Sequence, residues 1–168
     1  MEILIPKKAI QQRVKEIAKQ ISNDCRDKEP VLIGVLNGVI FFFADLVREI
    51  TVPTKIDFVR AASYGSKTVP DENIRFTKDI EIPVDGKPVI LVEDIIDTGS
   101  TLSQVIKIVD RKGAESIKVC ALIDKLERRG VAVNIDYCGF QVKEGFIVGY
   151  GLDYDEKYRY LSDICILK

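Results

Sequence analysis

Hydrophobic positions along the chain alternate between short continuous runs and a helical spacing of three to four residues. Over residues 7–24, isoleucine and valine recur at that helical spacing with lysine, arginine and glutamine between them, which predicts an amphipathic helix. Residues 30–36 form a continuous apolar run that is typical of a buried strand, and residues 39–50 predict a second helix. Residues 55–64, KIDFVRAASY, predict another strand.

The second half of the chain continues this alternation after a polar interruption. Residues 65–79 lack periodicity, which predicts a long loop or an irregular hairpin. Residues 87–94 form an apolar run bounded by a turn signal, as expected of a strand covered on both faces. Apolar residues spaced i, i+3, i+4 and i+7 over 102–109 predict a helix, which Gly113 ends. Further strands are predicted at 116–124, 133–142 and 146–154.

Strands that alternate with helices predict an α/β protein with a mostly parallel sheet, because parallel neighbours need crossover connections. The length of 168 residues favours one domain spanning 1–168. Ligands of such sheets bind beyond the carboxyl ends of the strands. Candidate functional residues should therefore lie where the predicted strands end.

Composition narrows the class of function. Lysine plus arginine total 25 against 26 for aspartate plus glutamate, so no strongly basic field indicates nucleic acid as the main partner. The chain has no histidine, which removes the commonest general base and the commonest zinc ligand. Its four cysteines are far apart and form no CxxC pair, so we expect reduced thiols in a cytoplasmic protein.

Residues 31–47 are apolar enough to raise the question of a membrane span. Asn37-Gly38 interrupts this segment and Asp45 lies inside it, whereas a spanning helix needs about 20 predominantly apolar residues. The N-terminal residues also lack the long apolar core and small-residue cleavage site of a signal peptide. We therefore expect a strand, a tight turn and a helix, and no membrane partner.

Residues 97–101, Asp-Thr-Gly-Ser-Thr, lie between a predicted strand and a predicted helix. The N–H groups of such a turn and the helix N-terminus can bind a phosphate, and Gly99 permits a tight backbone. The loop lacks both the lysine of GxxxxGK[ST] and the GxGxxG pattern. It therefore suits one terminal phosphate better than a di- or triphosphate chain.

Two acids, Glu93 and Asp94, come just before this loop. Carboxylates repel phosphate, so they should face hydrogen-bond donors or positive charge, such as sugar hydroxyls or Mg²⁺. Taken singly, these features have simpler explanations, since Asp97 could be a helix cap and the two acids could be solvated loop residues. Their joint occurrence after a buried strand favours a sugar-phosphate site.

The run from Glu93 to Thr101 resembles the phosphoribosyl-diphosphate-binding signature of the type I phosphoribosyltransferases: an acidic pair, two aliphatic residues and Asp-Thr-Gly-x-Thr. More narrowly, the chain resembles the hypoxanthine-guanine phosphoribosyltransferases, the 6-oxopurine group. The resemblance extends over nearly the whole chain through the separated segments LNGVIFFFADL, ASYGS, LIDKLERR and FIVGYGLDYDEKYRYL. It implies a five-stranded parallel sheet flanked by helices, with a small hood built from the N- and C-terminal segments.

The implied reaction is a purine-salvage transfer of the phosphoribosyl group of 5-phosphoribosyl 1-diphosphate to N9 of hypoxanthine or guanine. Mg²⁺ is the implied cofactor, and members of the family are usually cytoplasmic homodimers or homotetramers. The resemblance makes Asp97 the general base or acid at purine N7 and places the ribose hydroxyls on Glu93 and Asp94, with metal nearby. The residues implied to hold the 5-phosphate are Asp97, Thr98, Gly99, Ser100 and Thr101.

The purine side of the implied site comes from two later segments. Lys125 would donate to the 6-oxo group, and Phe146 would stack on the base. Ile147 would bind the purine edge through its backbone, and Asp153 would line this side and hold a second Mg²⁺. Without the resemblance, Lys125 would be interpreted as a surface lysine and Phe146 as a core residue.

The pyrophosphate contacts are assigned by the resemblance to Leu36, Asn37, Gly38 and Arg159. Asn37 stands where many relatives carry lysine or arginine, so it offers backbone N–H groups but no charge. The family often has a cis peptide at this point, and we expect one between Leu36 and Asn37. Ser63 and Tyr64 would begin a mobile loop that closes over the site and excludes water.

Other functions remain as alternatives. Lys125 disfavours an adenine enzyme, because a cation suits an acceptor oxygen rather than an amino group, whereas a xanthine-guanine enzyme stays open. A nucleotide-sensing RNA-binding regulator on the same fold would need a basic surface, and the richest basic stretch, residues 124–130, is short and contains acids. An inert α/β domain would not explain the agreement of so many distant segments.

Overall fold

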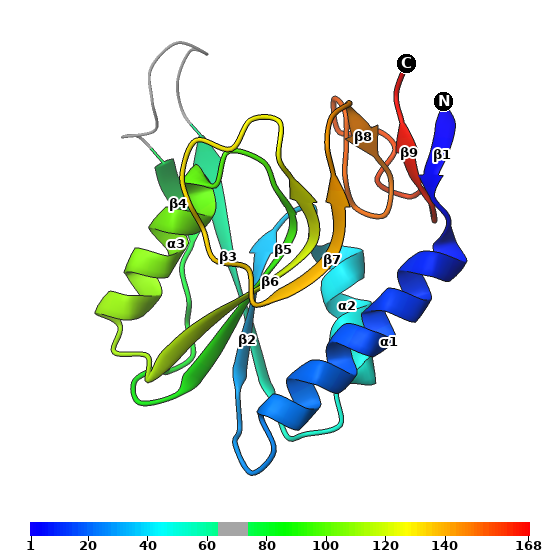
Figure 1. The fold of residues 1–168 in the computed structure, drawn as a ribbon. Coiled ribbons are helices and arrows are strands. Elements are labelled where there is room, and N and C mark those ends of the chain that lie inside the picture. The colour runs from blue at the N-terminus through cyan, green and yellow to red at the C-terminus, as the bar shows by residue number, and fades with distance from the viewer. Residues whose placement is uncertain (64–73) are drawn as a thin grey trace.

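The computed structural model describes residues 1–63 and 74–168 (Figure 1). In chain order its elements are β1 (Glu2–Ile5), α1 (Lys7–Asp24), β2 (Val31–Leu36), α2 (Ile40–Glu49), β3 (Lys55–Ser63), β4 (Ile74–Lys78), β5 (Pro88–Ile96), α3 (Ser100–Arg111), β6 (Ser116–Lys125), β7 (Tyr137–Val142), β8 (Ile147–Val148) and β9 (Ile164–Ile166). The helices expected from the helical spacing are present, and so are the strands expected before residue 125. The strand expected over 55–64 is described as far as residue 63.

The main sheet has six strands in the order β4-β3-β2-β5-β6-β7. Neighbours from β3 to β7 pair in parallel, and only β4 pairs antiparallel, with β3, at one edge of this sheet. The predicted α/β fold with a five-stranded parallel sheet is therefore confirmed, with one antiparallel edge strand added.

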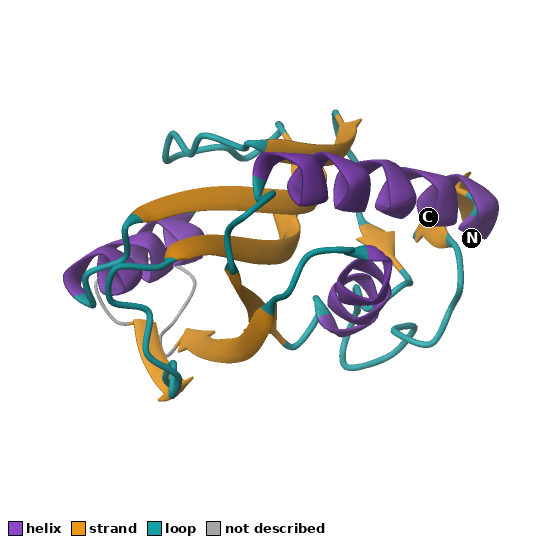
Figure 2. Cartoon of the chain, turned by 90° about the horizontal axis from the view of Figure 1, so that it is seen from below, coloured by secondary structure: helices purple, strands orange, loops and turns teal. Residues whose placement is uncertain are grey.

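Helices α1 and α2 cover one face of this sheet, and α3 covers the other (Figures 1 and 2). Along β5, Ile90 and Val92 belong to the core beneath α1 and α2, whereas Val89 and Leu91 belong to the core beneath α3. Because both faces of the strand are buried, its sequence is a continuous apolar run rather than an alternating one.

Strands from both chain ends form a second, three-stranded antiparallel sheet in the order β1-β9-β8. The two termini consequently lie side by side (Figure 1). The hydrophobic pattern did not predict β1 or β9, because strands of 4 and 3 residues are too short to show a period.

The strand expected over 146–154 is wrong in extent, since only Ile147–Val148 forms a strand. Gly149, Tyr150 and Gly151 have φ angles of 100°, 51° and 101°, and positive φ angles end the extended backbone there. Isolated bridges replace a continuous strand beyond this point.

The strand expected over 133–142 begins only at residue 137. Asp136, just before it, donates its N–H to the carbonyl oxygen of Val119 at 2.9 Å, and its side chain accepts the N–H of Val119 at 2.8 Å, where a longer β7 would use backbone acceptors. Within the polar stretch 65–79, residues 74–78 form β4, so this part is a hairpin strand rather than a loop. Residues 64–73 lie outside the described residues.

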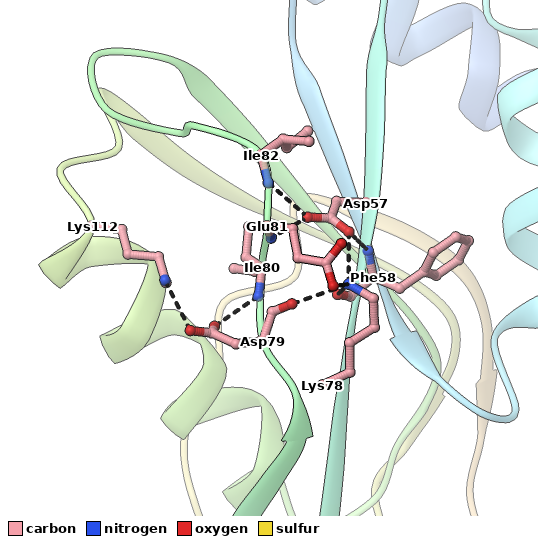
Figure 3. A network of polar contacts seen from close by, with 8 residues as sticks. All are labelled: Asp57, Phe58, Lys78, Asp79, Ile80, Glu81, Ile82 and Lys112. Carbon is pink, nitrogen blue, oxygen red and sulfur yellow. Dashed lines mark hydrogen bonds and ion pairs between the residues drawn. The ribbon is translucent and has the colours of Figure 1, made fainter.

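A polar network ties the β3–β4 edge together (Figure 3). Buried Asp57 on β3 accepts hydrogen bonds from Nζ of Lys78 at 2.9 Å and from the backbone N–H of Glu81 at 2.6 Å. Next to it, Lys112 near the end of α3 donates to Asp79 at 3.0 Å. The segment after β4 is thereby attached to both β3 and α3.

In the part of the chain that the structure describes, no helix is long and apolar enough to cross a membrane. The apolar segment 31–47 instead contains β2, a turn and most of α2, as expected.

Candidate active site

A cleft lies at the carboxyl ends of the parallel strands and consists of two adjoining cavities of about 260 Å³ and 650 Å³. The two cavities share Leu36, Asn37, Gly38, Ala61, Asp94, Ile95 and Asp97 in their walls. Most of the residues singled out in the sequence line this cleft: Leu36, Asn37, Gly38, Glu93, Asp94, Asp97, Thr98, Gly99, Thr101, Lys125, Phe146, Ile147, Asp153 and Arg159.

Among the described residues, two of those singled out, Ser63 and Ser100, do not line either cavity. Ser100 is the first residue of α3, and its backbone N–H donates to Oγ1 of Thr98 at 3.3 Å. Ser63 is the last described residue of β3, and Tyr64 lies outside the described residues.

The loop after β5 has the backbone of a helix-start anion site. Gly99 precedes α3 with φ 85° and ψ −5°, and a Cβ at this position would lie 2.6 Å from the carbonyl oxygen of Val131. Only glycine fits both the left-handed backbone and this close approach. Thr98, Gly99 and Thr101 line the smaller cavity at the N-terminus of the 12-residue α3. This geometry suits a single phosphate group.

Glu93 and Asp94 lie at the carboxyl end of β5, and each residue is only 8% exposed. Burial raises the pKa of both carboxyl groups, and the neighbouring Asp94 carboxylate raises the pKa of Glu93 further. A ligand that brings hydroxyl donors or a cation would stabilise the charged forms of both acids. Two adjacent carboxylates suit Mg²⁺ of the kind that keeps waters and bridges substrate phosphates. Among the described residues there is no cluster of three or more potential metal ligands.

The turn after β2, which contains Asn37 and Gly38, packs between β5 and the C-terminal segment. A Cβ at Gly38 would overlap Oδ2 of Asp94, and a Cβ at Gly151 would overlap the carbonyl oxygen of Gly38. The Leu36–Asn37 peptide bond is cis, as expected from the sequence. The cleft therefore has glycine backbone packed against a buried carboxylate on this side.

Another part of the wall of the larger cavity comes from the last residue of β6, Lys125, and from Phe146 and Ile147 at the start of β8. Lys125 is 8% exposed, and its Nζ lies 3.3 Å from Oε2 of Glu127. Phe146 is 50% exposed and packs edge-on against Tyr154 with ring centroids 5.3 Å apart. A half-exposed aromatic ring in a cavity wall provides a stacking surface for a flat ligand.

Asp153 and Arg159 contact each other directly. A guanidinium nitrogen of Arg159 lies 2.9 Å from Oδ1 of Asp153 and 3.1 Å from Oε2 of Glu156. Arg159 also donates to the carbonyl oxygen of Gly151 at 2.7 Å. The two residues to which the sequence assigned different ligands thus form one ion-paired group.

Asp97 is held by an arginine that the sequence analysis did not single out. One oxygen, Oδ2, lies 3.4 Å from a guanidinium nitrogen of Arg128. The other, Oδ1, is buried and has no hydrogen-bond partner among the described residues. A buried acceptor without a partner is an uncommon feature that points to an absent ligand.

Arg60 was also missed. It is the partner of Leu36 in the β2–β3 register and lines the larger cavity beside Asn37. Its side chain makes a long hydrogen bond of 3.5 Å to Thr77. The sequence could have indicated Arg60, because it is a charged residue near the carboxyl end of a predicted strand. The same feature identified Glu93 and Asp94.

A family model described as "Phosphoribosyl transferase domain" matches residues 2–155. The chain therefore belongs to the phosphoribosyltransferase family, a class of enzymes.

Individual relatives show to which phosphoribosyltransferases the chain is similar. The chain is 42% identical over 163 residues to a hypoxanthine phosphoribosyltransferase of Salmonella typhimurium, covering 96% of this chain and 92% of that protein. It is 40% identical over 167 residues to the hypoxanthine-guanine phosphoribosyltransferase of Bacillus subtilis, covering 99% and 93% respectively. The crystal structure of a hypoxanthine-guanine phosphoribosyltransferase from Bacillus anthracis is 43% identical, has a TM-score of 0.95, and covers 100% of this chain and 99% of that one.

Proposed function

We propose that this protein transfers the phosphoribosyl group of 5-phosphoribosyl 1-diphosphate to N9 of hypoxanthine or guanine, giving IMP or GMP and pyrophosphate. The observation that carries the proposal is that one cleft contains the Asp97–Thr101 loop, the buried acids and Lys125. The full-length similarity to hypoxanthine and hypoxanthine-guanine phosphoribosyltransferases supports a 6-oxopurine as the acceptor.

The phosphoribosyl half of the substrate would lie over β5 and the start of α3. The N–H groups and hydroxyls of the loop, from Asp97 to Thr101, would hold the 5-phosphate at the helix N-terminus. Glu93 and Asp94 would accept hydrogen bonds from the ribose hydroxyls, in addition to the backbone N–H groups of Asp94 and Ile95 that they already accept.

Mg²⁺ would bind on the same side of the cleft. When bound, it neutralises charge on the leaving pyrophosphate. Glu93 and Asp94 would hold this ion or its waters, and Asp153 would hold a second ion.

The purine would lie in the larger cavity. Lys125 would donate to the 6-oxo group, Phe146 would stack on the ring, and Ile147 would bind the purine edge through its backbone. Asp97 would take the N7 proton while N9 bonds to C1 of the ribose and the C1–oxygen bond to pyrophosphate breaks. The position of Asp97 in the walls of both cavities supports this role, because its carboxylate lies beside the space in which the purine would bind.

Pyrophosphate would lie against the turn after β2. The backbone of Leu36, Asn37 and Gly38 would contribute N–H donors, and Arg159 would contribute charge. The role of Ser63 and Tyr64 in closing the site stays a prediction.

The first experiment incubates the purified protein with Mg²⁺ and 5-phosphoribosyl 1-diphosphate, with hypoxanthine, guanine, xanthine or adenine added separately. We expect nucleotide formation from hypoxanthine or guanine and none from adenine, because Lys125 would face the 6-position and a cation suits an oxygen acceptor rather than an amino group. Product from xanthine with guanine would identify the xanthine-guanine alternative. No product from any base, together with salt-dependent RNA binding, would contradict the proposal and favour the regulator.

The cellular setting that fits this activity is the cytoplasm, in a homodimer or homotetramer, without nucleic acid or membrane partners. Size-exclusion chromatography with light scattering would give the oligomeric state directly.

A further inference from the structure

Arg129 lies behind the cleft, outside the walls of both cavities, in the turn that follows β6. Its side chain is 19% exposed and donates four hydrogen bonds. Their acceptors are the carbonyl oxygens of Asp97 at 3.0 Å, Ile96 at 3.0 Å and Lys125 at 3.3 Å, and Oδ1 of Asp124 at 2.5 Å.

These acceptors belong to the ends of two neighbouring strands. Ile96 and Asp97 end β5 and begin the phosphate loop, whereas Asp124 and Lys125 end β6. One guanidinium group therefore joins the backbone of the proposed general base to the backbone of the proposed purine-selecting lysine.

The backbone that follows Arg129 strengthens the same junction. The N–H groups of Gly130 and Val131 both donate to the carbonyl oxygen of Thr98, at 3.1 and 2.9 Å. The carbonyl oxygen of Val131 is the atom that a Cβ at Gly99 would meet at 2.6 Å. The turn after β6 thus supports the phosphate loop from behind.

We propose that Arg129 is a positioning residue that sets the separation between Asp97 and Lys125. N7 and the 6-oxo group lie at a fixed distance on the rigid purine, so the two side chains that engage them must be held at a matching separation. Arg129 acts on this separation without touching the substrate. The inference rests on the proposed roles of Asp97 and Lys125.

Arginine suits this task because its planar guanidinium group offers donors in a rigid fork that can reach several acceptors at once. Nε of Arg129 donates to the carbonyl oxygen of Asp97, and Nη2 donates to acceptors on Ile96, Asp124 and Lys125. Lysine carries the same charge on a single nitrogen and cannot hold both sets of acceptors at once. Arg129→Lys therefore keeps the charge but loses the two-nitrogen contact with the strand ends.

The test compares Arg129→Lys with Arg13→Lys. Arg13 is a matched control, since its guanidinium also donates to two backbone carbonyl oxygens, those of Gly139 and Cys138, at 3.1 and 2.5 Å, remote from the cleft. For both variants we would measure Tm, kcat and KM for hypoxanthine, the ratio of kcat/KM between hypoxanthine and adenine, and Kd for pyrophosphate with Mg²⁺.

For Arg129→Lys we expect kcat/KM for hypoxanthine to fall about 10- to 100-fold, as small misplacements of reacting groups do. We expect its preference over adenine to shrink and pyrophosphate binding to stay within about twofold, because the turn after β2 does not contact Arg129. Arg13→Lys should lower Tm but leave unchanged both kcat/KM for hypoxanthine and the preference for hypoxanthine over adenine. If Arg129→Lys loses no more activity than Arg13→Lys at a similar Tm, Arg129 only stabilises the fold and the inference is wrong.

Asp124→Asn serves if Arg129→Lys does not fold. Asp124 is a buried partner of Arg129, and the amide keeps its size while removing its charge. Asp124→Asn should lower kcat/KM for hypoxanthine and the preference over adenine by a smaller factor than Arg129→Lys. If neither quantity changes, the inference is also wrong.

Failure of the proposed function itself would look different. In that case the wild-type protein would form no nucleotide from hypoxanthine, or Asp97→Asn and Lys125→Ala would turn hypoxanthine over as fast as the wild type. Loss of activity in those two variants, with Arg129→Lys equal to its control, would overturn only the inference about Arg129.

Discussion

At the scale of single residues, the cleft contains charged side chains that have few hydrogen-bond or ion-pair partners among the described residues. Asp97 has one carboxylate oxygen next to Arg128 and another that is buried without a partner among the described residues. Asn37 contributes no charge to the proposed pyrophosphate side, while Arg60, in the wall of the same cavity, makes a 3.5 Å hydrogen bond to Thr77. Replacing Asp97 or Arg60 should therefore change turnover or ligand binding.

For Asp97→Asn we expect a retained fold and retained binding of 5-phosphoribosyl 1-diphosphate, with kcat lower by about 10²- to 10⁴-fold. The amide keeps the size of the side chain but cannot take the N7 proton. Steady-state kinetics and ligand titration would separate the two effects, with Asp110→Asn on the exposed side of α3 as the control. Near-normal kcat would remove Asp97 from catalysis.

For Arg60→Gln we expect Kd for pyrophosphate with Mg²⁺ to rise by about tenfold, the usual effect of losing one charge-assisted hydrogen bond. KM for hypoxanthine should change little. Arg75→Gln, on the neighbouring strand β4, removes the same charge away from the cavity walls and is the control. Asn37→Lys in the Arg60→Gln background should restore binding, and a rise in Kd for the Arg75 variant as well would show that only net charge matters.

At the scale of elements, the β3–β4 edge depends on a single buried acid. Asp57 accepts from Lys78 and from backbone N–H groups of the segment after β4 (Figure 3). Burial disfavours its charged form, but these hydrogen bonds outweigh burial and lower its pKa. The network attaches the segment after β4 to β3, the strand whose later residues Arg60 and Ala61 line the cleft.

For Asp57→Asn we expect a loss of about 3 kcal/mol in the free energy of unfolding at neutral pH, typical of breaking a buried ion pair. Because the pKa of Asp57 is lowered in the folded state, this stabilisation is present above the unfolded carboxyl pKa and is lost as pH falls through the folded pKa. The difference between wild type and variant should therefore shrink at acid pH.

Urea unfolding at several pH values would measure this difference. Asp79→Asn is the control, since its partner Lys112 and its own 60%-exposed side chain form a surface pair worth at most about 1 kcal/mol. A pH-independent difference would show that Asp57 acts through packing and neutral hydrogen bonds alone.

At the scale of the whole molecule, the cleft exists because two sheets meet. The C-terminal segment reaches from the smaller sheet to the strand ends of the main sheet, and Gly151 packs on the carbonyl oxygen of Gly38. Tyr150, in the same segment, donates its hydroxyl to Asp45 of α2 at 2.6 Å. The C-terminal segment that lines the larger cavity is thus attached to the turn after β2 and to α2.

For Tyr150→Phe we expect a loss of about 1 kcal/mol in the free energy of unfolding, since one hydrogen bond to a partly exposed acid is removed. KM for hypoxanthine should rise by a few-fold, because the segment that contains Phe146 and Ile147 loses its hydrogen bond to α2 and would position the purine less well. Tyr160→Phe, whose ring is 78% exposed, is the control. An unchanged KM with lowered stability would show that Tyr150 stabilises the fold without positioning the purine.

The sequence by itself determined the elements whose signal is local. The amphipathic stripe of α1, the buried run of β5 and the Asp97–Thr101 loop each depend on neighbours within a few residues, so the pattern predicted them. The assignment to the phosphoribosyltransferases followed from that loop and was confirmed by the family match.

Only the tertiary structure decided which distant groups meet. Arg128 at Asp97, Arg60 at Asn37 and the bridge of Arg129 all depend on the order of strands in the sheet, which leaves no local period in the sequence. The short β1 and β9 are stabilised by each other across the whole chain length, with Glu2 opposite Ile166. A contact between residues so far apart is selected by packing, whereas a helix or a phosphate loop is already specified by its own residues.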